Sequence, residues 1–396
     1  MEKHQIGDVG LFTCGLLVVV NLVIGTDNGA RVVDQVTVPY PPPTVECTGN
    51  GCESTIVSSN WSYIPLVANR FPPPATNSYY IWTTQDFWGL GCDIGTKLGN
   101  LSGDQDGFVF LDFGNPNQDS QARLGTILYN QSPISTDDIA SAVVVFSQGF
   151  YYCSQIIGAT DSLKIAVGTN SSGGTVTDVI AFQHGEAWSN LVIEINDRFL
   201  DYQGLTSRVV AVGGINVEPN FNPVYVPQHW MEGYNSVTDT RRQVVYVIGS
   251  ADECPLDFPP SILGTYTPGD CFKKYNGGVL VYKWTQEDIR NISWGFAMAW
   301  PFPEIYNSAT ADQWYRISLL SRFNHNSPMY FRGVITQLGA CEQLREQNPG
   351  VQICVGTDYA PNNGFLALYG RIQSDQYTVA GNHLKWSTDI RNYYGP

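Results

Sequence analysis

Two glutamates of this chain each lie near the end of a largely apolar run. Glu218 stands near the end of the run at 208–219 (RVVAVGGINVEP), and Glu304 stands in the run at 297–307 (AMAWPFPEIYN). A carboxylate placed directly after buried strand residues is costly unless it is hydrogen-bonded or functional. Hydrolysis of a glycosidic bond needs two carboxyl groups, one protonated as the acid and one ionised as nucleophile or base. We therefore take Glu218 and Glu304 as the candidate catalytic pair.

Other polar or aromatic residues are expected beside this pair. Asp112, at the end of the run at 107–114, is the candidate assisting carboxylate. The candidate substrate-binding residues are Asn216, Asp252, Tyr306, Trp300 and Trp88. The two tryptophans are the ones expected near the site, where an indole ring stacks on a sugar. For each acid the alternative is a structural role, in which it caps a helix or locks a loop.

Six apolar runs supply the strands that must position these residues. Near-continuous hydrophobicity without alternation is typical of strands buried on both faces, as at 107–114, 163–170, 208–219, 243–250, 297–307 and 329–338. Segments 79–82 and 383–386 are candidates for a seventh and an eighth strand. Helical patterns lie between the runs, at 139–148, 186–203, 227–234, 285–292, 312–323 and 363–372.

Strand and helix alternate about six times, which predicts a parallel α/β fold. No GxGxxG turn and no Walker loop follows any of the strands, so an open nucleotide-binding sheet is disfavoured. A (β/α) TIM-type barrel of seven or eight parallel strands accounts better for the polar strand ends, because every strand delivers its carboxyl end to one mouth.

The N-terminal part of the chain is expected to be separate from the barrel. Residues 9–25 are apolar except for Thr13 and Asn21, which predicts a signal peptide or an uncleaved signal-anchor over 1–30. A Pro-rich spacer follows at 31–78, and the barrel is expected over 79–396. Either interpretation of the leader places the barrel outside the cytoplasm, with membrane contact only through the N-terminal segment if it is uncleaved.

The cysteines favour a disulfide-stabilised protein. Nine are present, and eight remain when Cys14 of the apolar leader is set aside. Proximity in the sequence suggests the pairs Cys47–Cys52, Cys254–Cys271 and Cys341–Cys354, which leaves Cys92–Cys153. Disulfides persist in oxidising compartments, so we expect a secreted protein or one on the outer face of a membrane. No CxxC or paired-histidine pattern occurs, and we expect no metal site and no cofactor.

Composition and charge limit the partners. The chain carries 36 acidic against 21 basic residues, a net charge of −15, and no polybasic run, which excludes nucleic acid as an expected partner. Only 14% of residues are charged, whereas 13% are aromatic. Uncharged, aromatic-rich surfaces suit carbohydrate, although many secreted proteins share this composition whatever they bind.

Several blocks together resemble secreted bacterial proteins that have a glycoside-hydrolase-like barrel and no assigned activity. The blocks are FLDFG, AVGTN, VGGINVEP, HWMEGYNSVT, VVYVIGSADECP, KWTQEDIRNISWG, PFPEIYN, ADQWYRISL and CVGTDYAPNNGF, within residues 79–375. The resemblance implies a barrel fold and secretion, and it implies chemistry only by analogy. Asn216-Val217-Glu218-Pro219 also looks like the Asn-Glu-Pro motif of many barrel glycosidases, with Val217 inserted.

Two hypotheses about function result. The favoured one is an extracellular carbohydrate-active protein that hydrolyses a glycosidic bond with the carboxylates at the barrel mouth. The alternative is a non-catalytic cell-surface barrel that binds glycan or serves as a structural module. Two carboxyl groups across an open cleft favour the enzyme.

Overall fold

The barrel is built from eight parallel strands that follow one another in sequence. The structure is a computed structural model and describes residues 71–101, 103–119, 121, 123–156, 160–172, 177–256 and 266–396, besides the short strand pair β1 (Val23–Ile24) and β2 (Arg31–Val32). The barrel strands are β3 (Thr76–Ile81), β4 (Asp106–Asp112), β8 (Ser162–Asn170), β9 (Val209–Asn216), β10 (Val245–Gly249), β13 (Ala299–Pro303), β14 (Phe331–Thr336) and β15 (Asn382–Tyr393).

Each strand lies beside the next one in sequence, and β15 pairs with β3. The sheet closes between β13 and β14 through a single parallel bridge, which joins Glu304 to Ile335. The expected TIM-type barrel is therefore confirmed, with eight strands and a nearly complete ring. The first strand begins at Thr76, a little before the expected start of the barrel at residue 79.

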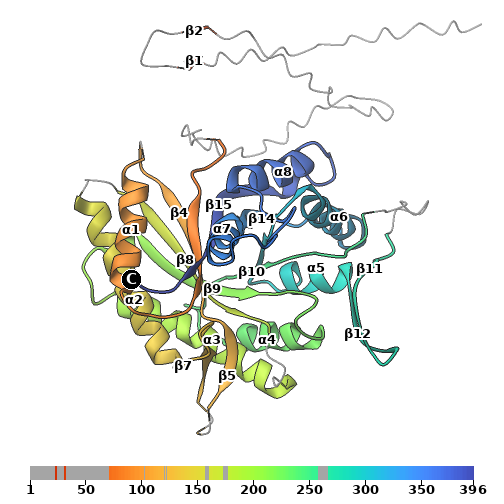
Figure 1. Cartoon of the computed structure of the whole chain (residues 1–396), viewed down its shortest axis with the longest axis horizontal. Helices are drawn as coiled ribbons and strands as arrows, with labels where there is room; N and C mark the ends of the chain where they lie inside the picture. Colours follow the sequence, from red (N-terminus) through yellow and green to blue (C-terminus); the bar gives the residue numbers. More distant parts are fainter. Residues whose placement is uncertain are drawn as a thin grey trace, which may run out of the picture. The chain divides into compact units, whose positions relative to one another are not determined.

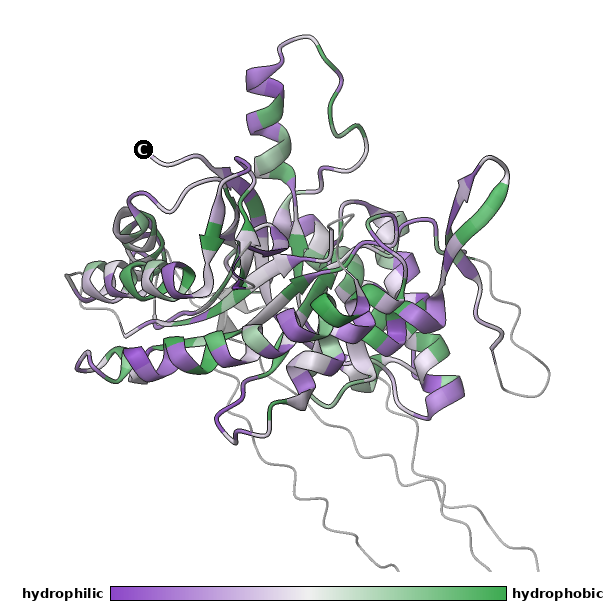
Figure 2. Ribbon diagram, turned by 90° about the horizontal axis from the view of Figure 1, so that it is seen from below, coloured by the Kyte–Doolittle hydropathy of each residue, from purple (hydrophilic) through white to green (hydrophobic). Residues whose placement is uncertain are grey.

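Helices cross over between the strands and cover the outside of the barrel (Figure 1). They are α1 (Phe87–Gly99), α2 (Thr136–Ile156), α3 (Asp178–Phe199), α4 (Tyr225–Ser236), α5 (Gln286–Trp294), α6 (Ser308–His325), α7 (Leu338–Gln347) and α8 (Pro361–Gln373). The six expected helical segments are all helices here, and α1 and α7 are additional. In Figure 2 the central strands are mostly hydrophobic, whereas the helices mix hydrophobic and hydrophilic residues, as expected for helices that bury one face.

The barrel interior is a packed core of aromatic and aliphatic side chains. Phe108 and Phe302 stack with ring centroids 4.2 Å apart, and Tyr246 meets both rings edge-on. Phe110 occupies the next layer, where a Cβ atom added to Gly168 or Gly214 would lie only 2.0 or 2.7 Å from its ring. Those two glycines are needed because the phenyl ring takes the space of their side chains.

Two short antiparallel sheets are inserted into the connections. The first, β5 (Asn115–Gln118), β6 (Leu124–Ile127) and β7 (Pro133–Ser135), lies between β4 and α2. The second is the hairpin of β11 (Asp270–Asn276) and β12 (Val279–Thr285), which projects from the barrel (Figure 1). The first insertion matters for the site, because it carries Tyr129 to the carboxyl end of the barrel.

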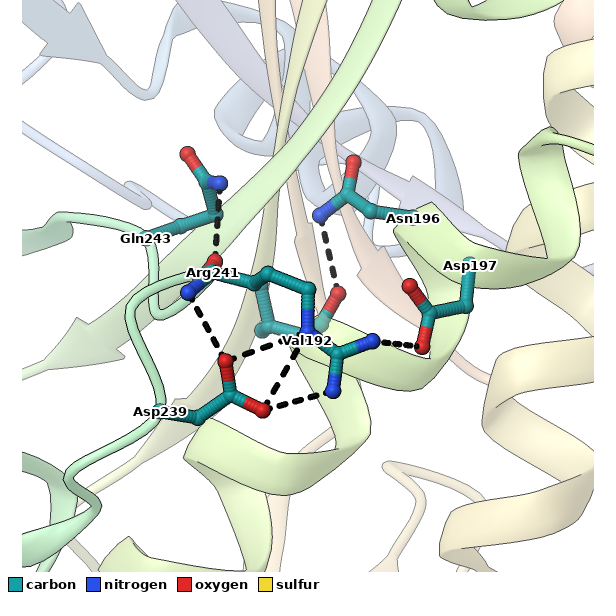
Figure 3. A network of polar contacts seen from close by, with 6 residues as sticks. All are labelled: Val192, Asn196, Asp197, Asp239, Arg241 and Gln243. Carbon is teal, nitrogen blue, oxygen red and sulfur yellow. Dashed lines mark hydrogen bonds and ion pairs between the residues drawn. The ribbon is translucent and has the colours of Figure 1, made fainter.

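Side chains of α3 fix the start of β9. The Asn196 amide donates to the Ala211 carbonyl at 2.9 Å and accepts from its N–H at 3.0 Å. The register of β9 with β10 begins only at Gly213, so Asn196 replaces a missing strand neighbour at Ala211. Beside it, Arg241 donates to Asp239 and Asp197, as Figure 3 shows. The Asn196 contacts hold the strand beyond whose other end Glu218 lies.

Three disulfides fasten the outer layer. They join Cys92 to Cys153, Cys254 to Cys271, and Cys341 to Cys354. These three expected pairs are confirmed, whereas the expected Cys47–Cys52 pair lies outside the described residues. The expected leader and most of the Pro-rich spacer also lie outside them. Over the residues that the structure does describe, no helix combines the length and the apolar character that crossing a membrane requires.

Candidate functional site

Polar side chains gather at the carboxyl end of the barrel, which we call the mouth. Every second residue of β4 points inward, so Asp112 follows Phe108 and Phe110 at the top of the same row. Asn170 and Asn216 are direct register partners on β8 and β9. Ser250 and Glu304 follow the last residues of β10 and β13, and those residues, Gly249 and Pro303, are themselves partners. The strand ends therefore converge as the sequence predicted.

The two candidate glutamates are neighbours in this mouth. Glu218 lies two residues beyond β9 and is partly exposed, whereas Glu304 is 1% exposed. Burial is the main cause that raises the pKa of Glu304 well above its ordinary value, and the Glu218 charge raises it further. The pKa of Glu218 is also raised by burial, but the nearby Glu304 carboxyl and the hydrogen bond from Ser250 lower it. One proton between the two carboxyls satisfies these opposing effects.

Glu304 is the least satisfied acid of the site. Neither of its oxygens has a partner in hydrogen-bond geometry among the described residues, although the Tyr306 hydroxyl and the Glu218 carboxyl are near enough to affect its pKa. Its backbone is fixed on both sides, because its N–H donates to the Gly249 carbonyl at 3.0 Å and it bridges to Ile335. Burial and the neighbouring Glu218 carboxylate therefore both favour the protonated form of Glu304.

Asp112 forms a second polar group. Its carboxylate accepts from the Gly114 N–H at 2.8 Å and from the Tyr129 hydroxyl at 2.9 Å, and the Asn216 amide is a third partner. Asn170 in turn donates to the Tyr129 hydroxyl at 3.2 Å. Burial outweighs these donors and raises the pKa of Asp112 to about 7. Asp112 is therefore poised to exchange a proton near neutral pH.

Tyr80 connects the two groups. Burial raises the pKa of its phenol well above the ordinary value, and the charges of Glu304, Asp112 and Glu218 all raise it further. A phenol that is sensitive to all three carboxyls lies among them. The hydroxyl of Tyr80 therefore stays protonated and is available as a hydrogen-bond donor.

Aromatic rings line the rim of the mouth. The ring of Tyr129 lies 4.9 Å from that of Tyr80 and 6.1 Å from that of Trp82. Tyr394 continues the row, with its ring 5.0 Å from Trp82. The Trp82 indole N–H is held by Asn392 at 3.1 Å. These rings form a continuous, partly exposed platform beside the carboxyls.

The structure brings five of the eight candidate residues together, namely Asp112, Asn216, Glu218, Glu304 and Tyr306. Asp252 lies at the edge of this group. Its side chain is exposed, yet its charge raises the pKa of both Glu218 and Glu304. Partial loss of solvent around its carboxyl group and the Glu253 charge also raise the pKa of Asp252 itself.

Trp300 and Trp88 do not lie where we expected them. Trp300 is the second residue of β13 and so stands at the amino end of the barrel, opposite the mouth. Trp88 is the second residue of α1, is 42% exposed, and packs against Tyr152 of α2 in a hollow of the helical layer. The expectation that both lie at the mouth is wrong, because Trp300 stands at the other end of its strand and Trp88 packs on the outside of the helical layer.

Six residues of the site were missed, namely Tyr80, Trp82, Tyr129, Asn170, Ser250 and Tyr394. Asn170 and Ser250 are the last residues of two apolar runs, so the signal that pointed to Asn216, a polar residue near the end of such a run, also pointed to them. Tyr80 precedes the end of the first strand. Tyr129 had no local signal, because a long connection brings it to the mouth.

Among the residues that the structure describes, no group of three or more histidine, cysteine, aspartate or glutamate side chains is arranged to hold a metal ion. The site can instead donate and accept protons through two inequivalent glutamates, with Asp112, Tyr80 and Tyr306 around them. Comparison of the chain with protein-family models and with curated proteins gives no match.

Proposed function

We propose that this protein is an extracellular glycoside hydrolase whose acid is Glu304 and whose ionised carboxylate is Glu218. The observation that carries the proposal is the proximity of these two glutamates at one barrel mouth, where each affects the pKa of the other, with unequal exposure and unequal hydrogen bonding. Two carboxyls whose surroundings separate their protonation states are the arrangement that glycosidic hydrolysis uses.

The difference in environment assigns the roles. Glu304 is buried without donors, so it holds its proton and gives it to the leaving oxygen. Glu218 accepts a 2.6 Å hydrogen bond from Ser250 and is partly exposed, so of the two glutamates it is the one that carries the negative charge. The charged Glu218 attacks the anomeric carbon or activates a water, while departure of the Glu304 proton neutralises the leaving group.

The surroundings of the pair support a polyhydroxylated substrate. Glu304 and the Asn216 amide oxygen are buried acceptors without partners in hydrogen-bond geometry, and sugar hydroxyls are suitable donors. The rim of Tyr80, Trp82, Tyr129 and Tyr394 supplies apolar faces for a pyranose ring. Three disulfides in the outer layer support an oxidising, extracellular setting.

One observation favours the alternative of a barrel that binds glycan without cleaving it. Glu304 is only 1% exposed, so a neighbouring side chain must move before a substrate can reach it. A screen of extracellular glycans for release of reducing ends separates the two functions, with the double variant E218Q/E304Q as control. If the native protein hydrolyses a glycan and the double variant does not, the result supports a glycoside hydrolase. Glycan binding of equal strength in both proteins, with no hydrolysis in either, replaces it by the alternative.

A further inference from the structure

A cavity of about 450 Å³ lies at the amino end of the barrel, opposite the mouth. It is lined by the first residues of several strands, among them Lys164 of β8, Trp300 of β13 and Arg332 of β14. Because β13 and β14 are bridged only at Glu304 and Ile335, near their carboxyl ends, no ladder joins them at this end.

Aromatic rings and cations alternate around this cavity. The Arg332 guanidinium lies 4.0 Å from the centre of the Trp300 ring. The Trp386 ring has Lys385 Nζ at 5.1 Å and Lys164 Nζ at 5.8 Å from its centre. Two indoles thus hold three cationic groups around one space, in a chain whose net charge is −15.

The acidic group that could neutralise the cations of this cavity already has partners of its own. Asp106 is the acidic residue of the cavity lining, and its carboxylate pairs with Lys385 and accepts from the Ser162 hydroxyl at 2.9 Å. Arg208 also lines the cavity, but its guanidinium donates to the Asp161 carbonyl and to Ser154. The described residues provide no hydrogen-bond or ion-pair partner for the charged groups of Lys164 and Arg332.

The surroundings of Lys164 contain too little negative charge to stabilise its ammonium group. Burial lowers the pKa of its ammonium group first, the nearby Lys385 and Arg332 lower it further, and the attraction of Asp106 does not offset these effects. A partly buried cation in this situation is stabilised by an added negative charge. A guanidinium with free N–H groups, stacked and oriented by an indole, suits the planar or tetrahedral oxygens of an oxyanion.

We propose that this cavity is an anion-binding site, in which Arg332 and Lys164 bind the oxygens of a phosphate, sulfate or carboxylate group. Trp300 and Trp386 form the walls and orient the two cations. The site is independent of the proposed hydrolysis, because it lies at the other end of the barrel from the two glutamates.

The test is calorimetric titration of the full-length, oxidised protein with inorganic phosphate, with sulfate and glucuronate as parallel arms at low ionic strength. We expect saturable binding of at least one anion, at least ten-fold weakened in R332Q and in K164M, and weakened by added sodium chloride. The arms distinguish a tetrahedral oxyanion from a carboxylate as the source of the charge. K274M, which removes the same charge from the exposed hairpin strand β11, is the matched control.

Thermal unfolding without anion checks that the variants fold. K164M should be at least as stable as the native protein, because it removes a desolvated cation that has no partner. The proposal is overturned if none of the three anions binds, or if R332Q and K164M bind as tightly as K274M.

Discussion

Ser250 donates a 2.6 Å hydrogen bond to Glu218 from the strand that lies between the two glutamate-bearing strands. β10 lies between β9 and β13 in the barrel, and Ser250 is the first residue after β10. Its hydroxyl therefore reaches the Glu218 carboxyl on the β9 side. Glu304, on the other side, receives no donor in hydrogen-bond geometry. The Ser250 hydroxyl therefore adds to the difference in burial between the two neighbouring glutamates, and the two differences together underlie the roles proposed for them.

Replacing Ser250 by alanine removes that donor. The ionised form of Glu218 loses stabilisation, so its pKa should rise, and activity that needs the ionised form should fail at a higher pH. We expect the acidic limb of the kcat/KM profile to move upward in S250A. S250T keeps the hydroxyl and should restore the native limb. An unchanged limb in S250A would mean that Glu218 does not titrate in the reaction.

The two glutamates should differ in their response to the leaving group. Changing either to glutamine should reduce hydrolysis of a natural glycan by roughly 10²–10⁴-fold, the usual contribution of such a group. An aryl glycoside whose leaving group needs no proton should restore much of the activity of E304Q but not of E218Q. Steady-state rates on both substrates measure this. If the aryl glycoside restored the activity of E218Q instead, Glu218 would be the acid and Glu304 the ionised carboxylate.

Asp112 should make stability depend on pH. Its folded pKa of about 7 lies above its ordinary value of 3.8, so the folded protein holds the proton more tightly. The stabilisation is complete below about pH 4 and is lost as pH rises toward 7. At about 1.4 kcal/mol for each unit of pKa, the loss is on the order of 4 kcal/mol.

In D112N this contribution is absent, so the free energy of unfolding should fall less between pH 4 and 7 than in the native protein. Urea unfolding at a series of pH values measures the slope. E186Q, on the exposed face of α3, is the control and should keep the native slope. Parallel slopes for D112N and the native protein would show that Asp112 does not hold a proton over this range.

The barrel could be predicted because strands that are buried on both faces have sequences of continuous apolar residues. The site could be predicted in part because polar residues occur near the ends of these runs, where buried residues are expected. They are Asn216, Glu218 and Glu304. Tyr129 could not be predicted, because its place depends on how the β5–β7 insertion folds over the mouth. Trp300 was misplaced because composition marks an aromatic residue as a candidate, whereas only its position along β13 sets the end it reaches.

The disulfides should stabilise the barrel unequally. Cys92–Cys153 joins α1 to α2 across 61 residues, whereas Cys341–Cys354 closes a segment of 13 residues. A cross-link restricts the unfolded chain more when the closed loop is longer, by about 4 kcal/mol for the long loop and about 3 kcal/mol for the short one. The double variants C92A/C153A and C341A/C354A should therefore both unfold at lower urea concentration, the first more than the second.

Unfolding of both variants and of the native protein, followed by far-ultraviolet circular dichroism, measures this order. The alanine pairs avoid placing hydroxyls at Cys153 and Cys341, which are 6% and 1% exposed. Fully reduced native protein should be less stable than either variant, because it lacks every cross-link. If C341A/C354A were the less stable of the two, loop closure would not dominate. The packing of Cys341 at the start of α7, rather than chain entropy, would then explain what that bridge contributes.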